Sequence, residues 1–224
     1  MGEGNQYLRG GFAKGTRVQR RDGLCAIDSI AIGDEVLSGQ NDHFGQPMFR
    51  KVTHVLHWPQ LQVHRLRYSF QDGDKEPTRS FITMTENVRL WAGLVPGWVP
   101  LCGLHLLGET LRESWPSPRG DLSVQPETAK TIYRTEQAGV GWIEDHTQFD
   151  IQGREGSLFN YAEYKPLNPS HAVLNGHIYD SENPFLCVDV YHLVVEETHS
   201  FYVGTQLLVH DAFQKVLYNP NHYY

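Results

Sequence analysis

The sequence has few cysteines, few charged residues and no long hydrophobic run. Its three cysteines, Cys25, Cys102 and Cys187, are odd in number and widely spaced, so they predict no disulfide framework and are typical of a reducing compartment. No apolar run approaches the roughly 20 residues that a membrane-spanning helix needs, and the polar segment 1–10 has no apolar signal-peptide core. We therefore expect a cytoplasmic location, with secretion by a specialised system left open.

Charge is also scarce, and its balance is acidic. Lys and Arg number 19 against 26 Asp and Glu, and charged residues are only 20% of the 224 in the chain. A net charge of −7 argues against a general nucleic-acid binder and against binding to an anionic membrane surface. Hydrophobic residues, at 40%, are numerous enough for a core, which excludes wholesale disorder. The length predicts one domain, which we expect to be a monomer.

The hydrophobic pattern favours β-strands. Windows with helical spacing are scarce, whereas short β-branched and aromatic runs recur. Asp22-Gly23 and Asp72-Gly73 lie between such runs and predict tight hairpin turns, because glycine tolerates the positive φ that these turns require. The pattern therefore predicts an all-β fold. The expected strands are Thr16–Gln19, Leu24–Ile27, Glu35–Leu37, Lys51–Leu56, Leu61–Ser69, Ser80–Thr85, Val88–Trp91, Ile132–Thr135, Cys187–Val195, Ser200–Val203 and Gln206–Val209.

Two stretches interrupt this pattern, and one segment has an echo elsewhere in the chain. Residues of about 112–130 and 164–184 are rich in proline and polar residues, which predicts surface loops inserted into the β fold. Ser29–Val36 is loosely repeated in Leu104–Leu111, since both have the order aliphatic pair, glycine, acid, aliphatic. Chance similarity between two hairpin corners and a duplicated unit with pseudo-two-fold symmetry both stay open.

Two motifs near the ends of the chain resemble those of Hint domains, the fold shared by inteins and Hedgehog autoprocessing regions. The first is Gly11-Phe-Ala-Lys-Gly-Thr-Arg-Val18, followed by Ile27–Ser38. The second is Val190–Gly204, with an acidic turn that contains a histidine, followed by Leu207-Leu-Val-His-Asp211. The resemblance implies an all-β, pseudo-two-fold horseshoe of short antiparallel strands whose two ends meet at one site.

The middle of the chain narrows this resemblance. Tyr133–Thr135 and Gly139–Ile143 are similar to the insert of a bacterial Hint subgroup found with polymorphic-toxin and Rhs-type proteins. The resemblance implies a single domain at residues 11–211, with a flank at 1–10 and a tail at 212–224. By resemblance alone, a protein partner would be a toxin or a secretion-system component.

The N-terminal junction lacks the residues that cleavage in this family needs. A thiol or hydroxyl on the residue after the bond attacks the preceding carbonyl, but the resemblance places Gly11 where the family has Cys. Cleavage by this route at Gly10–Gly11 is therefore chemically impossible. The Thr-x-x-His element that polarises the bond and protonates the leaving nitrogen falls on Thr85–Val88. Thr85 is kept, and Val88 replaces the histidine.

The C-terminal junction keeps more of its expected residues. In the family, a terminal Asn cyclises onto its own carbonyl with help from the preceding His. Here His210 is present and Asp211 stands in place of Asn; its carboxylate could form an anhydride, although an ionised carboxylate is a weak nucleophile at neutral pH. Ala212 offers no nucleophile, which excludes ligation of the flanks. His199 matches the histidine of the acidic turn, either in a structural hydrogen bond or in catalysis.

Three functional hypotheses follow. The leading one is a degenerate Hint domain, a structural or protein-interaction module that neither splices nor cleaves its N-terminal junction, with a degenerate site formed by Thr85, His199, His210 and Asp211. The alternative is an autoprotease that cuts after Asp211 with help from His210. The third is a small-ligand binder that uses the cleft of the former active site.

Other kinds of site have little support. His54 and His57 are three residues apart on a strand and point to opposite faces, which is a poor arrangement for one ion. His171, His177 and Cys187 show no zinc spacing. The sequence contains neither a Gly-x-Ser-x-Gly elbow nor a glycine loop before a helical pattern. We expect no metal and no cofactor.

Overall fold

The structure is a computed structural model, and it describes residues 6–39, 47–72, 78–92, 97–103, 122–135, 137–144, 156–167, 184–204 and 207–214. Within these ranges the regular structure is β, apart from two short 3-10 segments, η1 (Ile27–Ser29) and residues 101–103. The strands are β1 (Gln6–Tyr7), β2 (Phe12–Ala13), β3 (Arg17–Arg20), β4 (Gly23–Ala26), β5 (Glu35–Ser38), β6 (Met48–Gln62), β7 (His64–Asp72), β8 (Thr78–Met84), β9 (Arg89–Ala92), β10 (Gly97–Pro100), β11 (Leu122–Thr131), β12 (Tyr133–Arg134), β13 (Val140–Glu144), β14 (Gly156–Asn160), β15 (Lys165–Pro166), β16 (Cys187–Val195), β17 (Ser200–Val203), β18 (Leu207–His210) and β19 (Phe213–Gln214). The predicted all-β fold is confirmed.

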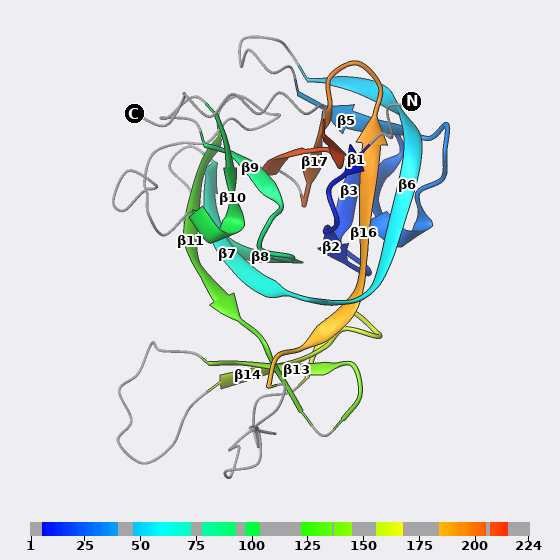
Figure 1. Ribbon diagram of the computed structural model, residues 1–224. Helices are drawn as coiled ribbons and strands as arrows, with labels where there is room; N and C mark the ends of the chain where they lie inside the picture. Colours follow the sequence, from blue (N-terminus) through cyan, green and yellow to red (C-terminus); the bar gives the residue numbers. More distant parts are fainter. Residues whose placement is uncertain are drawn as a thin grey trace, which may run out of the picture.

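The strands form three antiparallel sheets. Thirteen strands make one large sheet in the order β10-β9-β18-β17-β3-β5-β6-β16-β2-β8-β7-β11, with β4 attached to β3. A small sheet has the order β12-β13-β14-β15, and β1 pairs with β19. Figure 1 shows that the large sheet curls, with β6 and β16 on one side and β7, β8 and β11 on the other, while β13 and β14 lie below it. The curl brings strands from both ends of the chain together.

Most predicted strands are confirmed, because their hydrophobic alternation is strong. Cys187–Val195 and Ser200–Val203 form strands with the predicted bounds. The Asp22-Gly23 turn joins β3 to β4, where Arg20 pairs with Gly23 and Gly23 has a φ of 122°. The expected strand Leu61–Ser69 is instead divided between β6 and β7 at the buried residue Val63.

The prediction of an inserted loop at 112–130 is wrong for its second half. Leu122–Thr131 forms β11, which pairs with β7 from Leu122↔Asp72 to Thr131↔His64. β11 is the last strand in the order, and a sheet edge tolerates proline, which has no N–H to donate. The register shifts directly after Pro126. Proline is compatible with an edge strand as well as with a loop, and in this segment it belongs to an edge strand.

Other predictions fall partly or wholly outside the described residues. The loop expected at 164–184 contains β15, and its residues 168–183 lie outside, with His171 and His177. The echo Leu104–Leu111 and the turn residue Gly73 also lie outside, so pseudo-two-fold symmetry stays a prediction. Among the described residues, no helix is long and apolar enough to cross a membrane.

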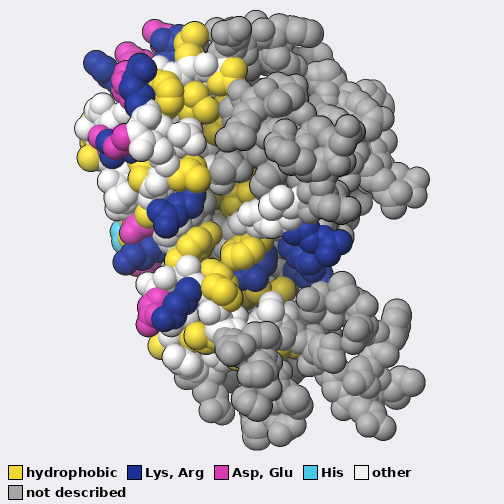
Figure 2. All heavy atoms as spheres, turned by 180° about the vertical axis from the view of Figure 1, so that it is seen from behind, with side chains coloured by type: hydrophobic (Ala, Val, Ile, Leu, Met, Phe, Trp, Pro, Cys, Tyr) yellow, Lys and Arg dark blue, Asp and Glu magenta, His cyan; other side chains and the backbone are white. Residues whose placement is uncertain are grey.

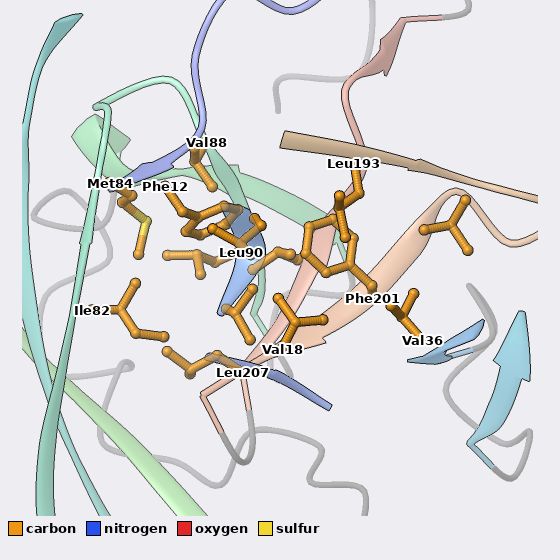
Figure 3. Close-up of a cluster of buried hydrophobic side chains, with 14 of the residues drawn as sticks. Phe12, Val18, Val36, Ile82, Met84, Val88, Leu90, Leu193, Phe201 and Leu207 are labelled. Carbon is orange, nitrogen blue, oxygen red and sulfur yellow. The ribbon is translucent and has the colours of Figure 1, made fainter. Parts of the chain in front are cut away.

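Apolar side chains hold the curled sheet together. The largest buried cluster takes residues from strands distributed along the whole sheet order, and its side chains converge in Figure 3. A second cluster contains Val63, Ile143, Phe159 and Val190, so it joins the large sheet to the small one. Full burial of one such side chain contributes about 1.5–3 kcal/mol. The members labelled in Figure 3 are Phe12, Val18, Val36, Ile82, Met84, Val88, Leu90, Leu193, Phe201 and Leu207.

Candidate junction site

Strand β16 contacts both of the junctions that the sequence singled out. On the N-terminal side, Phe12 pairs with Tyr191, so the preceding residue Gly11 lies against this part of β16. On the C-terminal side, the Ala212 N–H donates to the Leu193 carbonyl over 3.0 Å. One strand therefore positions the two places in the chain where an intein-type reaction would occur.

A chain of hydrogen bonds fixes the N-terminal junction. The Gly11 N–H donates to Thr85 Oγ1 over 3.0 Å, and the Thr85 N–H donates to the Gly11 carbonyl over 2.9 Å. The Thr85 hydroxyl then donates to Asn87 Oδ1 over 2.7 Å, and Asn87 Nδ2 donates to the Arg9 carbonyl over 2.7 Å. Thr85 therefore contacts both backbone polar groups of Gly11. Asn87 is a further contact residue that the sequence did not single out.

The backbone at Gly11 leaves no room for a side chain, whereas at Gly10 the nearest atoms are the ends of the Asn87 and Thr85 side chains. A Cβ on Gly11 would lie 2.3 Å from the Tyr191 carbonyl oxygen and 3.2 Å from His192 Cβ. A Cβ on Gly10 would lie 2.3 Å from Asn87 Oδ1. Both distances of 2.3 Å are far inside ordinary van der Waals contact. The N-terminal junction therefore lacks both a nucleophile and the space to hold one.

Val88 belongs to the hydrophobic core. Its side chain is fully buried in the largest apolar cluster, and Figure 3 shows it next to Phe12. Its carbonyl accepts the Leu101 N–H over 2.9 Å. A buried valine in this place supplies packing and has no proton to give. The polar contact with the junction comes from its neighbour Asn87 instead.

The carboxylate of Asp211 is held from two directions at the C-terminal junction. Its side chain is fully buried. Oδ2 accepts the Val195 N–H over 2.9 Å and lies 3.2 Å from His199 Nδ1. The Asp211 N–H donates to the His199 carbonyl over 2.9 Å. Two hydrogen bonds therefore join Asp211 to the His199 turn, and a third joins it to β16.

The side chain of His210 contacts the carbonyl of the candidate scissile bond. His210 Nδ1 lies 2.8 Å from the Asp211 carbonyl oxygen, so this nitrogen carries the hydrogen and donates it. The ring packs edge-on against Trp98 at 4.9 Å. Burial is the largest cause that lowers the pKa of His210, and the Asp211 backbone and charge oppose it. A neutral imidazole in this position polarises the Asp211–Ala212 bond.

His199 lies in a tight turn between β16 and β17. Its φ is 52° and that of Glu197 is 64°, both in the left-handed region that few non-glycine residues adopt. The His199 side chain is 38% exposed, whereas its partner Asp211 is buried. Part of the His199 ring therefore faces solvent while Nδ1 contacts the carboxylate. Both the structural and the catalytic interpretation of His199 fit this geometry.

His192 is a buried residue between the junctions that sequence reasoning missed. Its Nδ1 accepts the Leu193 N–H over 3.0 Å, while Nε2 is buried without a partner among the described residues. The ring packs edge-on against Phe12 and Phe201. Burial, with a smaller effect of His210, lowers the pKa of His192 to about 3. The signal available in the sequence was a histidine inside the otherwise apolar and aromatic run Val190–Val195.

The segments outside the two junctions pair with each other. The Leu8 N–H donates to the Ala212 carbonyl over 2.9 Å. Beyond this bond, Tyr7 pairs with Phe213 and Gln6 with Gln214 in an antiparallel ladder. Ala212 is fully buried. The parts of the flank and the tail that the structure describes therefore form a clasp, the pairing of β1 with β19, next to the junctions.

The structure does not bring His54 and His57 together on one partner. His54 Nδ1 lies 3.1 Å from Thr53 Oγ1, and His57 Nε2 lies 3.1 Å from Asp189 Oδ2. Within the described ranges, no three His, Cys, Asp or Glu side chains are grouped as metal ligands. The junction residues also form no such group.

Comparison with solved structures identifies the fold. The solution structure of a bacterial intein-like domain from Clostridium thermocellum is similar with a TM-score of 0.52 and 18% identity, over 90% of this chain and 98% of that chain. A DnaB intein from Synechocystis sp. PCC 6803 is similar with a TM-score of 0.48 and 14% identity, over 91% of this chain and 99% of that chain. No protein-family model and no curated protein matches the sequence.

The first of these likenesses shows that the chain has the intein, or Hint, fold. It covers nearly the whole of the other domain, and it agrees with the curled antiparallel sheet described above. The fold expectation that came from the two terminal motifs is therefore confirmed. At 18% identity the likeness concerns the fold alone.

Proposed function

We propose that this chain is a Hint-type domain that neither splices nor cleaves at its N-terminal junction and that serves as a structural or protein-interaction module. The observation that carries this proposal is the contact at Gly11, where a Cβ would lie 2.3 Å from the Tyr191 carbonyl oxygen. A family member with cysteine at this position needs a different backbone path. The fold persists here around a glycine.

The hydrogen bonds at this junction support the same proposal. Thr85 Oγ1 still accepts the Gly11 N–H, which in an active domain would belong to the leaving nitrogen. Without a nucleophile, this hydrogen bond only holds the N-terminal junction next to the end of β8. Val88, in the hydrophobic core, cannot protonate the leaving nitrogen. Ala212, at the other junction, has no nucleophile for ligation. By resemblance, the partner of such a module is a toxin or secretion-system component in a bacterial cytoplasm.

A second candidate function rests on one specific observation. His210 Nδ1 lies 2.8 Å from the Asp211 carbonyl oxygen, so the carbonyl of the Asp211–Ala212 bond is polarised. In this reaction Asp211 Oδ1 attacks its own carbonyl carbon, the bond to the Ala212 nitrogen breaks, and that nitrogen takes a proton from water. A second water then opens the cyclic anhydride. Against it, Oδ2 is already engaged by Val195 and His199.

Intact-mass analysis separates the two functions. Purified protein is incubated for days at several pH values, with and without thiol, and its mass is followed. The proposal expects one unchanged mass and no effect of thiol. A pair of fragments that divides the chain after Asp211 and is lost in His210→Ala, but not in the exposed control His54→Ala, would establish the second function instead.

A further inference from the structure

A cavity lies between the large sheet and the small sheet, away from the junction residues. Its volume is about 250 Å³, slightly below the range of about 300–1,000 Å³ usual for small-molecule sites. Of the described residues that line it, four are cations and none is acidic. Figure 2 shows Lys and Arg side chains gathered beside hydrophobic ones on this face of the molecule. The lining residues are Arg65, Arg67, Arg79, Ser80, Phe81, Lys130, Ile143 and Ser157.

Strand register places these cations on one face of the sheet. Arg65 and Arg67 are two residues apart on β7, so they share a face. Arg67 is opposite Phe81 on β8, and Arg79 is two residues before Phe81. Lys130 on β11 is opposite Arg65. The register therefore gathers all four cations around the cavity.

Arg65 is the deepest of the four cations. Only 7% of the residue is exposed, and its guanidinium lies over Phe81 at 4.0 Å and over Phe159 at 4.7 Å. Nη2 donates to the Tyr161 hydroxyl over 3.1 Å, while Nε is buried without a partner. Among the described residues, no carboxylate pairs with it. Aromatic faces hold the charge in place and leave it without a neutralising partner.

Tyr161 does not supply the missing negative charge. Burial raises the pKa of its phenol, and the nearby Arg65 opposes this only in part, so the hydroxyl is protonated at neutral pH. A buried arginine is ordinarily paired with an anionic group. The cavity that Arg65 lines is where such a group can enter.

We propose that this cavity is a binding site for a phosphate monoester of a small molecule. Four cations match a doubly charged group better than a single carboxylate, and guanidinium groups bind phosphate oxygens in pairs. Ser157 can donate a further hydrogen bond. Phe81 and Ile143 provide an apolar wall for the organic part.

Calorimetric titration of the full chain tests the site with three probes: glycerol 3-phosphate, inorganic phosphate and citrate. We expect saturable one-to-one binding of glycerol 3-phosphate, with weaker binding of the other two. Arg79 is exposed, so its replacement should not disturb the core. Arg79→Gln should weaken binding about tenfold. Arg21→Gln is the matched control, because Arg21 is an exposed arginine that pairs with Glu35 elsewhere.

Each alternative result overturns the assignment. Equal affinity for inorganic phosphate would assign the cavity to the free ion, and tighter binding of citrate would assign it to carboxylates. If Arg79→Gln and Arg21→Gln weakened the binding of glycerol 3-phosphate equally, the binding would depend on the overall charge of the protein and not on this cavity. If none of the three probes bound saturably, the cavity would not be a binding site for anions. Arg65→Gln, checked for folding by circular dichroism, should abolish binding if its fold is retained.

Discussion

The N-terminal and C-terminal junctions contact the same strand, β16, but they differ in what the chain offers at each. At the first, Gly11 carries no side chain, and the carbonyl of Tyr191 occupies the place where a Cβ would be. At the second, Asp211 carries a buried carboxylate, and His210 contacts the carbonyl of the candidate scissile bond. At the first junction the space for the chemistry is closed, whereas at the second only the attacking atom differs.

On the proposed function, the two junctions differ from the Hint motifs by different amounts. Restoring the N-terminal junction requires a new nucleophile, a new proton donor and a new backbone path. Restoring the C-terminal junction requires the exchange of one oxygen for nitrogen in a side chain that is already in position. The predictions below test that contrast.

The largest effect we expect is the gain of cleavage at one junction and not at the other. Asp211→Asn provides an amide nitrogen next to the carbonyl that His210 polarises, so we expect fragments that divide the chain after residue 211. Gly11→Cys should give no thiol-dependent cleavage, because its side chain meets the Tyr191 carbonyl. Mass spectrometry after incubation with and without thiol measures both. Thiol-dependent cleavage in Gly11→Cys would remove the contrast.

The second effect is on stability at the N-terminal junction. Gly11→Ala places a methyl group 2.3 Å from a backbone oxygen, so we expect the free energy of unfolding to fall by about 3 kcal/mol or more. Gly33→Ala is the control: its φ is 91°, but its Cβ would meet nothing within 4 Å, and about 1–2 kcal/mol is expected there. Denaturant unfolding of both variants gives the comparison. Equal losses would show that backbone conformation, not crowding, disfavours side chains at Gly11.

The third effect is the pH dependence of stability. It arises from His192, the buried residue between the two junctions. The pKa of this residue is lowered to about 3 in the folded chain, so the unfolded chain binds its proton more tightly. The free energy of unfolding should therefore fall as pH drops below about 6.5, by about 1.4 kcal/mol per pH unit from this residue. The trend continues towards pH 3.

His192→Asn removes this titration and should make the pH dependence shallower by one proton. Urea unfolding between about pH 7 and pH 5 measures the slope. His54→Asn, at an exposed position, is the matched control variant. An unchanged slope in His192→Asn would mean that the buried ring takes up its proton without cost.

The smallest effect is expected at Thr85. Thr85→Val keeps the shape but removes the oxygen that accepts the buried Gly11 N–H, which should cost about 1–2 kcal/mol of unfolding free energy. Thr85→Ser keeps the oxygen and should cost less. Denaturant unfolding of the pair resolves the difference. If Val and Ser cost the same, the hydrogen bond is not what anchors the N-terminal junction.

Much of the fold could be predicted from the sequence, because alternation of apolar residues reports directly on strands. β16 and β17 had the predicted bounds, since their apolar positions are continuous and flanked by polar turns. β11 was missed because an edge strand tolerates the proline and polar residues that are also typical of loops. Composition alone does not separate these two cases.

The site could be predicted only as far as the motifs reached. The structure brings His199, His210 and Asp211 together at one junction and places Thr85 against Gly11 at the other. Asn87 and His192 could not be assigned, because their contacts depend on strands distant in sequence. The crowding at Gly11 was likewise beyond a sequence pattern, which showed that a nucleophile was lacking but not that its place was filled. Tertiary contacts decided each of these points.

The clasp of β1 and β19 has a consequence for how such a domain can be joined to other proteins. An antiparallel ladder brings the incoming chain at Gln6 and the outgoing chain at Gln214 to neighbouring points. A polypeptide that carries this domain therefore leaves it close to where it entered. The domain can be inserted at a surface loop of a host protein without separating the host strands on either side. This geometry holds independently of any chemistry at the junctions.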